Sequence, residues 1–154
     1  MKILRSLFLV FVLCGAFGKH AFATHLLTGR LECVFLEDLG AANKYRATLT
    51  LYSDVTAGVV DSSVLLAIHE NQNNSRLAVM VVELTSTQED SILIAFNYYY
   101  RYTKHIYTHE FTYSSSDCYL RQTRCCRVGI SNLIEEQGLS LYADIPGDII
   151  KVRA

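Results

Sequence analysis

The sequence predicts an all-β fold, an antiparallel immunoglobulin-like β-sandwich of about seven or eight short strands. Apolar and polar residues alternate over most of the chain, as they do in strands that bury one face. Short segments rich in Asn, Asp, Gly, Ser and Thr interrupt this alternation after runs of strand length. The chain has one proline, Pro146, and no Pro- or Ser-rich linker. We therefore expect a single domain over residues 24–154, large enough to bury its own core.

The first two expected strands carry the clearest alternation. Over 27–35, apolar or small residues occupy the odd positions, whereas Thr28, Arg30 and Glu32 occupy even positions. Over 45–52, the odd positions carry Tyr, Ala and Leu, and the even positions carry Arg, Thr and Tyr. Because successive side chains of a strand point to opposite faces, this period of two predicts two half-buried strands.

Later segments supply the remaining strands. Residues 64–69 and 77–84 are apolar and rich in β-branched types, and the turn-like composition of 71–75 separates them. Further strands are expected at 92–102, 105–113, 119–127 and 139–144. Breaks are expected between these segments, including one at 85–90. The one expected helical turn covers 131–137.

Residues 1–23 have the layout of a secretory signal peptide. Two basic residues precede an apolar run over 7–14, and small residues occupy the two positions that a signal peptidase reads before the cut. The apolar stretch of about 12 residues is shorter than the ~20 that a membrane-spanning helix needs, which disfavours an uncleaved anchor. We expect cleavage between Ala23 and Thr24, with a cut after Gly18 as the alternative.

Removing this segment changes the charge of the chain. The whole sequence has 14 basic and 15 acidic residues, and three of the basic ones lie in 1–23 with no acidic one, so 11 − 15 leaves a net charge of −4. That balance disfavours a nucleic-acid binder that relies on positive charge. No later segment is apolar over the length of a membrane span, so we expect an exported chain, extracellular or at the outer cell surface, without a transmembrane segment.

Export places four remaining cysteines in an oxidising compartment, where disulfides are expected. If 119–127 is a strand, Cys125 and Cys126 point to opposite faces and cannot easily pair with each other. Cys118 lies over about 20 Å from them along an extended strand, unless the chain folds back. Cys33 is therefore expected to pair with Cys125 or Cys126, in a bridge that contributes on the order of 4 kcal/mol. Cys118 would then be free or held by a turn at 114–117.

Two histidines invite a metal or catalytic interpretation. His105 and His109 are four residues apart, which on a helix would present two zinc ligands. The segment is expected to be a strand, in which four residues span about 13 Å. Two ligands that each lie within ~2.1 Å of one zinc cannot be so far apart. A catalytic cysteine with either histidine as its base has no supporting local signature. We expect no metal, no cofactor and no catalytic residue.

A tyrosine-rich stretch gives the candidate binding face, formed by Tyr98, Tyr100, Tyr102 and Tyr107 with two cations among them. Exposed aromatic side chains interleaved with cations can bind a glycan or a protein partner. Tyrosine is also a favoured strand residue, and one face of each strand must be buried, so core packing is the competing interpretation.

Three arginines surround the cysteine pair. Arg121, Arg124 and Arg127 can mark an anion site, or they can lie on strand faces and pair with local acids such as Glu135 or Glu136. Exposed pairs of this kind contribute little to stability.

Several segments together resemble a known family. The chain reads Ala-Thr-His-Leu-Leu-Thr-Gly at 23–29, Tyr-Arg-Ala-Thr-Leu-Thr-Leu-Tyr-Ser-Asp at 45–54, Arg-Cys-Cys-Arg at 124–127 and Gly-Ile-Ser-Asn-Leu-Ile at 129–134. These resemble the N-terminal domain of large secreted surface proteins of the Bacteroidetes, of the gliding-motility-associated or PKD-repeat-containing type. The resemblance implies a β-sandwich at the cell surface. Val55 stands where the family has a cysteine, which implies a reduced disulfide set.

These observations favour an exported, non-enzymatic structural or adhesion module that contacts protein or glycan at the cell surface. A second hypothesis is a fimbrial-type subunit that assembles by strand exchange through an unpaired sheet edge. A third is a small secreted hydrolase without a recognisable motif, which would need a deep pocket lined by titratable groups.

Overall fold

The computed structural model describes residues 26–56, 60–115, 117–124 and 138–146. These ranges form seven antiparallel strands and no helix, so the all-β antiparallel prediction is confirmed. The strands are β1 (Leu26–Asp38), β2 (Asn43–Asp54), β3 (Ser63–Glu70), β4 (Arg76–Ala95), β5 (Tyr98–Tyr113), β6 (Cys118–Arg124) and β7 (Leu139–Asp144). The expected cleavage site, the helical turn at 131–137, Cys125, Cys126 and Arg127 lie outside the described residues.

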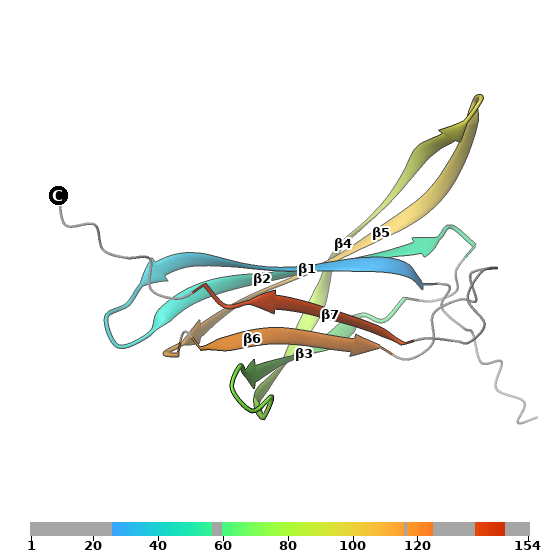
Figure 1. Cartoon of the computed structure of the whole chain (residues 1–154). Coiled ribbons are helices and arrows are strands. Elements are labelled where there is room, and N and C mark those ends of the chain that lie inside the picture. The colour runs from blue at the N-terminus through green and yellow to red at the C-terminus, as the bar shows by residue number, and fades with distance from the viewer. Residues whose placement is uncertain (1–25, 57–59, 116, 125–137, 147–154) are drawn as a thin grey trace, which may run out of the picture.

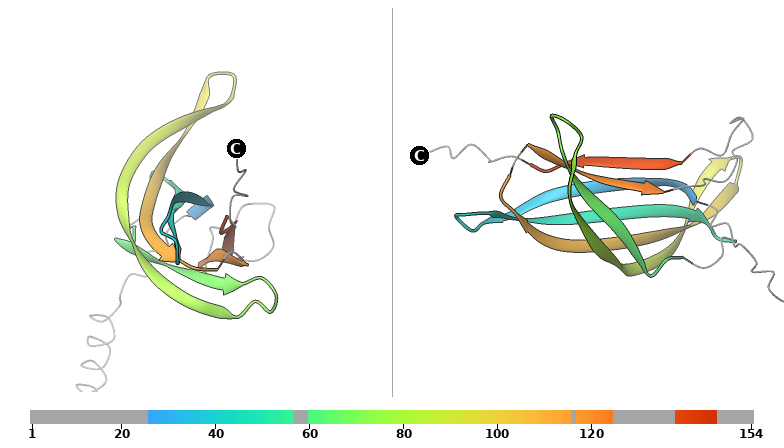
Figure 2. Two further views of the ribbon diagram at one scale, coloured as in Figure 1. Left: turned by 90° about the vertical axis from the view of Figure 1, so that its left-hand side faces the viewer. Right: turned by 90° about the horizontal axis from the view of Figure 1, so that it is seen from below.

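The strands follow the order β1-β2-β5-β4-β3-β6-β7 across one strongly curved sheet. β4 takes part in both halves of it, because residues 76–83 pair with β3 and residues 84–95 pair with β5. As a result, β1, β2 and β5 form one layer, and β3, β6 and β7 form the layer that faces it (Figure 1). The sheet curls until its two ends approach each other (Figure 2).

One predicted break does not exist. Residues 85–90 continue β4, and the chain turns instead at Phe96 and Asn97, whose φ angles are 38° and 68°. Positive φ at both central residues is the requirement of the tight two-residue turn that suits a twisted hairpin. Segment 85–90 was expected to be a turn because it is polar, but its polarity reflects exposure to solvent along a long strand. Similarly, β5 continues through 103 and 104, where two strands were expected.

The core lies between the two layers and receives side chains from all seven strands. On β2 the expected alternation is present, since the odd-numbered Tyr45, Ala47, Leu49 and Leu51 are buried while Arg46 is exposed. The opposite layer contributes the buried side chains Val64, Leu66, Ile68, Leu120 and Leu139.

A glycine lets the two ends of the sheet meet. If Gly29 of β1 had a Cβ, that atom would lie 2.7 Å from Leu141 Cδ1 of β7 and 2.8 Å from Leu51 Cδ2. The absent side chain is therefore what gives the leucine of β7 its place against β1. Further along β2, the Tyr45 hydroxyl donates a hydrogen bond to the Pro146 carbonyl at 3.2 Å, which joins β2 to the segment after β7.

Candidate functional site

The hairpin of β4 and β5 extends beyond the two layers (Figure 1). Residues 89–101 form this extension, which we call the arm. The last pairing between β5 and β2 joins Tyr102 to Asp54, and the last pairing between β4 and β3 joins Glu83 to Ser63. Within the arm, the ladder pairing therefore joins the two strands of the hairpin only to each other.

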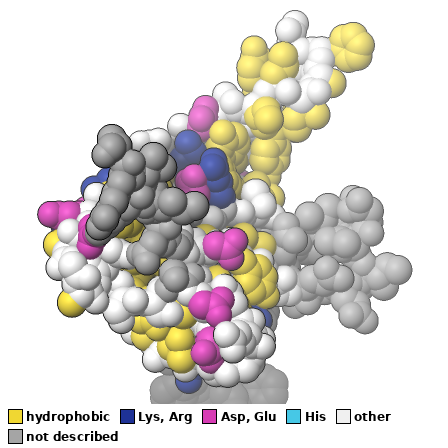
Figure 3. All heavy atoms as spheres, turned by 60° about the vertical axis from the view of Figure 1, so that its left-hand side comes forward, with side chains coloured by type: hydrophobic (Ala, Val, Ile, Leu, Met, Phe, Trp, Pro, Cys, Tyr) yellow, Lys and Arg dark blue, Asp and Glu magenta, His cyan; other side chains and the backbone are white. Residues whose placement is uncertain are grey.

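The arm exposes a concentration of large apolar side chains. Phe96 at the turn is 103% exposed, and the others are each more than half exposed. Yellow apolar side chains accordingly cover much of the arm in the space-filling view (Figure 3). The exposed set is Ile92, Leu93, Ile94, Phe96, Tyr98 and Tyr99.

Apolar side chains occupy both faces of the arm. Ile92 pairs with Tyr100, and Leu93 pairs with Tyr99. Paired residues of an antiparallel ladder share a face, and successive residues lie on opposite faces. One face therefore carries Ile92 and Tyr100, and the other carries Leu93 and Tyr99. Neither face covers the other from water.

Polar side chains at the base of the arm satisfy one another. The Tyr100 hydroxyl donates to Asp54 Oδ2 at 2.7 Å, and this hydrogen bond is the main reason why the pKa of Tyr100 is raised. Arg101 forms an ion pair with Glu89 at 2.6 Å. Between these charged residues and the turn, residues 91–100 contain no charged side chain. The arm thus passes from a paired polar base to an uncharged tip.

The predicted tyrosine face is only partly present. Tyr98 is exposed, and Tyr100 and Tyr102 are half-buried with hydroxyls that donate to carboxylates. Tyr107 does not belong to this face: it is 0% exposed, and its hydroxyl donates to the Asp61 carbonyl at 2.9 Å inside the protein. The other three tyrosines occupy even-numbered positions of β5, so the odd-numbered Tyr107 points to the opposite face of the strand.

Sequence reasoning missed the apolar part of the arm. Residues 92–96 read Ile-Leu-Ile-Ala-Phe, so the alternation with polar residues stops there. Such a run usually marks a strand covered on both faces. The loss of alternation was the signal that could have indicated the apolar arm. A local pattern does not specify whether the groups that cover such a strand belong to the same chain or to a partner.

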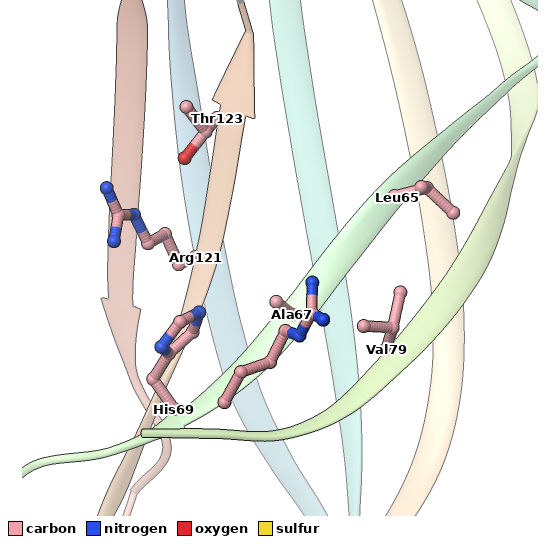
Figure 4. A pocket seen from close by; sticks show the side chains of 7 residues that line it. Leu65, Ala67, His69, Val79, Arg121 and Thr123 are labelled. Atoms are coloured by element: carbon pink, nitrogen blue, oxygen red, sulfur yellow. The ribbon is translucent and has the colours of Figure 1, made fainter. Parts of the chain in front are cut away.

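A hollow of about 550 Å³ lies on the outer face of β3, β4 and β6 (Figure 4). Ala67 of β3 pairs with Val79 of β4 on one side and with Arg121 of β6 on the other, so the smallest side chain of this row lies at its centre. The Arg121 guanidinium lies 5.4 Å from the centre of the Tyr142 ring on β7. The lining residues are Leu65, Ala67, His69, Arg76, Val79, Arg121 and Thr123.

The arginines of the predicted anion site separate in the structure. Arg124 forms an ion pair with Asp61. Arg121 and Arg76 form no ion pair with any described residue, so the hollow presents two cations beside apolar carbon atoms. Most of its lining residues are exposed, so the hollow is shallow and open to solvent. Arg127, Glu135 and Glu136 lie outside the described residues.

The two histidines of β5 do not share a site. His105 is buried, with its Nε2 2.8 Å from the Ser53 hydroxyl, and burial is the main cause of its lowered pKa. His109 pairs with Ala47 further along the same ladder. Among the residues that the structure describes, no three His, Cys, Asp or Glu side chains come together as metal ligands would.

Cys33 and Cys118 are free thiols in the structure. Cys118 is buried, with its Sγ 3.7 Å from the Ser115 hydroxyl. Burial raises the pKa of Cys33 to about 11, whereas a nucleophilic cysteine needs a lowered pKa. Because Cys125 and Cys126 lie outside the described residues, the pairing of Cys33 with either stays a prediction.

The fold and surface define an all-β protein with an exposed apolar arm. Within the described ranges, no helix has the length and apolar character needed to cross a membrane. No protein family, curated protein or solved structure matched the chain in the three comparisons. The expected relation to surface proteins of the Bacteroidetes therefore stays a prediction.

Proposed function

We propose that this chain is an exported, non-enzymatic module of the cell surface that adheres through its arm. The apolar side chains on both faces of the arm and at its turn carry the proposal. Moving a large apolar side chain out of water contributes roughly 1.5–3 kcal/mol, so the arm gains from any partner that covers it. Exposed apolar clusters of this kind mark interaction sites on soluble proteins.

The proposal extends to the finer features expected from the sequence. An immunoglobulin-like sandwich, a bridge from Cys33 to Cys125 or Cys126, and membership of the Bacteroidetes surface proteins would form one consistent description. The two facing layers and the half-buried position of Cys33 on β1 support it. The signal-like segment over 1–23 supports export to the extracellular space or the outer surface.

Binding of the purified protein to intact cells of its source organism, measured by flow cytometry, tests this function. We expect Ile94→Ser/Phe96→Ser to bind at least about tenfold more weakly, because two large apolar contacts are lost. Leu65→Ser is the matched control, since Leu65 is also an exposed apolar residue (61%) but lies on β3, outside the arm. Equal binding by the arm variant and the wild type, or failure to export the protein, would contradict the proposal.

A second candidate, the fimbrial-type subunit, is favoured by the outer edge of β4. Among the described strands, β3 pairs with β4 only up to Glu83, and the Leu84 N–H still donates to the Ser62 carbonyl, so residues 85–95 keep an edge without a strand partner. Such an edge offers backbone groups to a donor strand from another chain. Sedimentation over a range of protein concentrations tests this candidate: assembly that grows with concentration is expected, and a permanent monomer contradicts it.

A further inference from the structure

We infer that the tip of the arm enters the headgroup region of a lipid bilayer, with the Phe96 turn leading. The inference rests on the proposed function, because it takes the arm as the contact element and adds the chemistry of its partner: a lipid surface.

The distribution of apolar groups around the arm favours lipid. A flat protein surface would cover Tyr98 or Tyr99, which are successive residues of β5 and lie on opposite faces, but not both. Pairing of two β4 edges between copies of the chain would satisfy backbone groups and still leave Phe96 and both faces in water. A lipid surface contacts the turn and the two faces at once.

The charge distribution fits the same partner. Residues 91–100 contain no charged side chain, and the nearest charges are Asp90 and Arg101. Asp90 accepts a hydrogen bond from the Tyr102 hydroxyl at 3.2 Å, and Arg101 is paired with Glu89. The charges therefore stay at the base of the arm. Tyr98 and Tyr99 lie between tip and base, the position in which amphipathic rings meet lipid headgroups.

The backbone limits the depth of entry. The outer edge of β4 has no strand partner among the described residues beyond Glu83, and an unsatisfied backbone group in hydrocarbon costs several kcal/mol. The distance from Ile92 to Phe96 along a strand is about 13 Å. Interfacial elements penetrate only about 5–10 Å, where water and headgroups still satisfy polar groups. The part that enters is thus the turn with Ile94 and Phe96, while Tyr98 and Tyr99 lie at the level of the headgroups.

Tryptophan fluorescence provides a local test, because the chain contains no tryptophan. Phe96→Trp places a single reporter at the turn, and Leu65→Trp places one at an exposed position on β3. With phosphatidylcholine vesicles, we expect the emission of the Phe96→Trp variant to shift to shorter wavelength and to be quenched by brominated phosphatidylcholine. The Leu65→Trp variant should show neither change. Since both variants are made with the same N-terminus, the apolar run over 7–14 cannot account for a difference between them.

Vesicle flotation of Ile94→Ser/Phe96→Ser gives a quantitative test. We expect about tenfold weaker partitioning for each large side chain removed, with Leu65→Ser unchanged. Circular dichroism of each variant verifies folding, which solvent-exposed positions should preserve.

Three results would overturn the inference: no spectral shift of the Phe96→Trp variant with vesicles, a shift that follows protein concentration without vesicles, or flotation unaffected by the arm substitutions. If arm variants lose cell binding while vesicles leave the reporter unchanged, the partner is a protein or glycan, and the proposed function survives without the inference. If vesicles shift the reporter but the arm is dispensable for cell binding, the inference survives and the proposed function fails.

Discussion

The Ser53 hydroxyl and the Nε2 atom of His105 lie 2.8 Å apart, both inside the core, and join β2 to β5. The other ring nitrogen of His105 lies 3.5 Å from the Thr87 hydroxyl on β4. One imidazole thus connects three neighbouring strands close to the base of the arm. Burial, assisted by the charge of Arg124, lowers its pKa from the usual 6.5, so the folded protein favours the neutral ring.

Stability should therefore fall on mild acidification. Below pH 6.5 the unfolded chain binds a proton that the folded His105 resists. The contribution of neutral His105 to the free energy of unfolding is complete above pH 6.5, the pKa of the unfolded chain. It is lost as the pH falls through the lower pKa of His105 in the folded protein. Urea unfolding at about pH 7.5 and about pH 5.5 measures it. His105→Asn should reduce the difference, and His109→Asn should retain it. An NMR titration that places the pKa of His105 at or above 6.5 would contradict this account.

The contact between the two ends of the sheet predicts a cost for Gly29→Ala. The added methyl would meet Leu141 Cδ1 at 2.7 Å and the buried Leu51, so strands must shift. We expect a loss of about 1–3 kcal/mol in the free energy of unfolding. Thr28→Ala, at the exposed neighbouring position, is the control. Equal stability of Gly29→Ala and the wild type would show that β1 and β7 are not in close contact.

Tyr107→Phe isolates one buried hydrogen bond. Its hydroxyl donates to the Asp61 carbonyl at 2.9 Å, and removal leaves that carbonyl without this donor. The expected loss is about 1 kcal/mol in denaturant unfolding. Tyr98→Phe, on the exposed arm, should change stability by much less. If the two variants are equally stable, Tyr107 does not have the core role described above.

Glu110 on β5 should make stability depend on pH in the acidic range. Hydrogen bonds from Lys44 and Arg46 lower its pKa to about 2, from 4.5. The resulting stabilisation is present above pH 4.5 and is lost as the pH falls towards 2. Glu110→Gln should flatten this part of the profile, whereas Glu83→Gln should not. Added salt should weaken the wild-type effect, because both ion pairs of Glu110 are exposed. A salt-independent profile would argue against these ion pairs.

Alkylation of Cys33 distinguishes a bridge from a free thiol. A bridge to Cys125 or Cys126 predicts no reaction with iodoacetamide in denaturant until reductant is added. Rapid reaction in denaturant alone would refute the bridge. In that case, the pKa of about 11 predicts much slower alkylation of the folded protein at about pH 8, because little thiolate is present. Peptide mapping without reduction locates the modified residue.

The sequence predicted strands correctly where apolar and polar residues alternate because one face of the strand is buried. Tyr45 to Leu51 alternate because one face of β2 meets the core, and the structure has these residues as expected. Alternation says less about partners. Residues 92–95 have the composition of a strand covered on both faces, yet they project into solvent, since nothing in a local pattern specifies what lies opposite. The length of β4 was missed for a related reason: residues 85–90 are polar because most of their side chains are exposed to solvent.

The dual membership of β4 has a mechanical consequence. The strand runs from the arm along β5 and onward beside β3, so tension applied at Phe96 is carried into both layers. Ladder hydrogen bonds lie across the strand direction, and a pull along the strands loads many of them together in shear. A pull at the turn would therefore be resisted by ladder hydrogen bonds of the whole sheet and not by those of the hairpin alone.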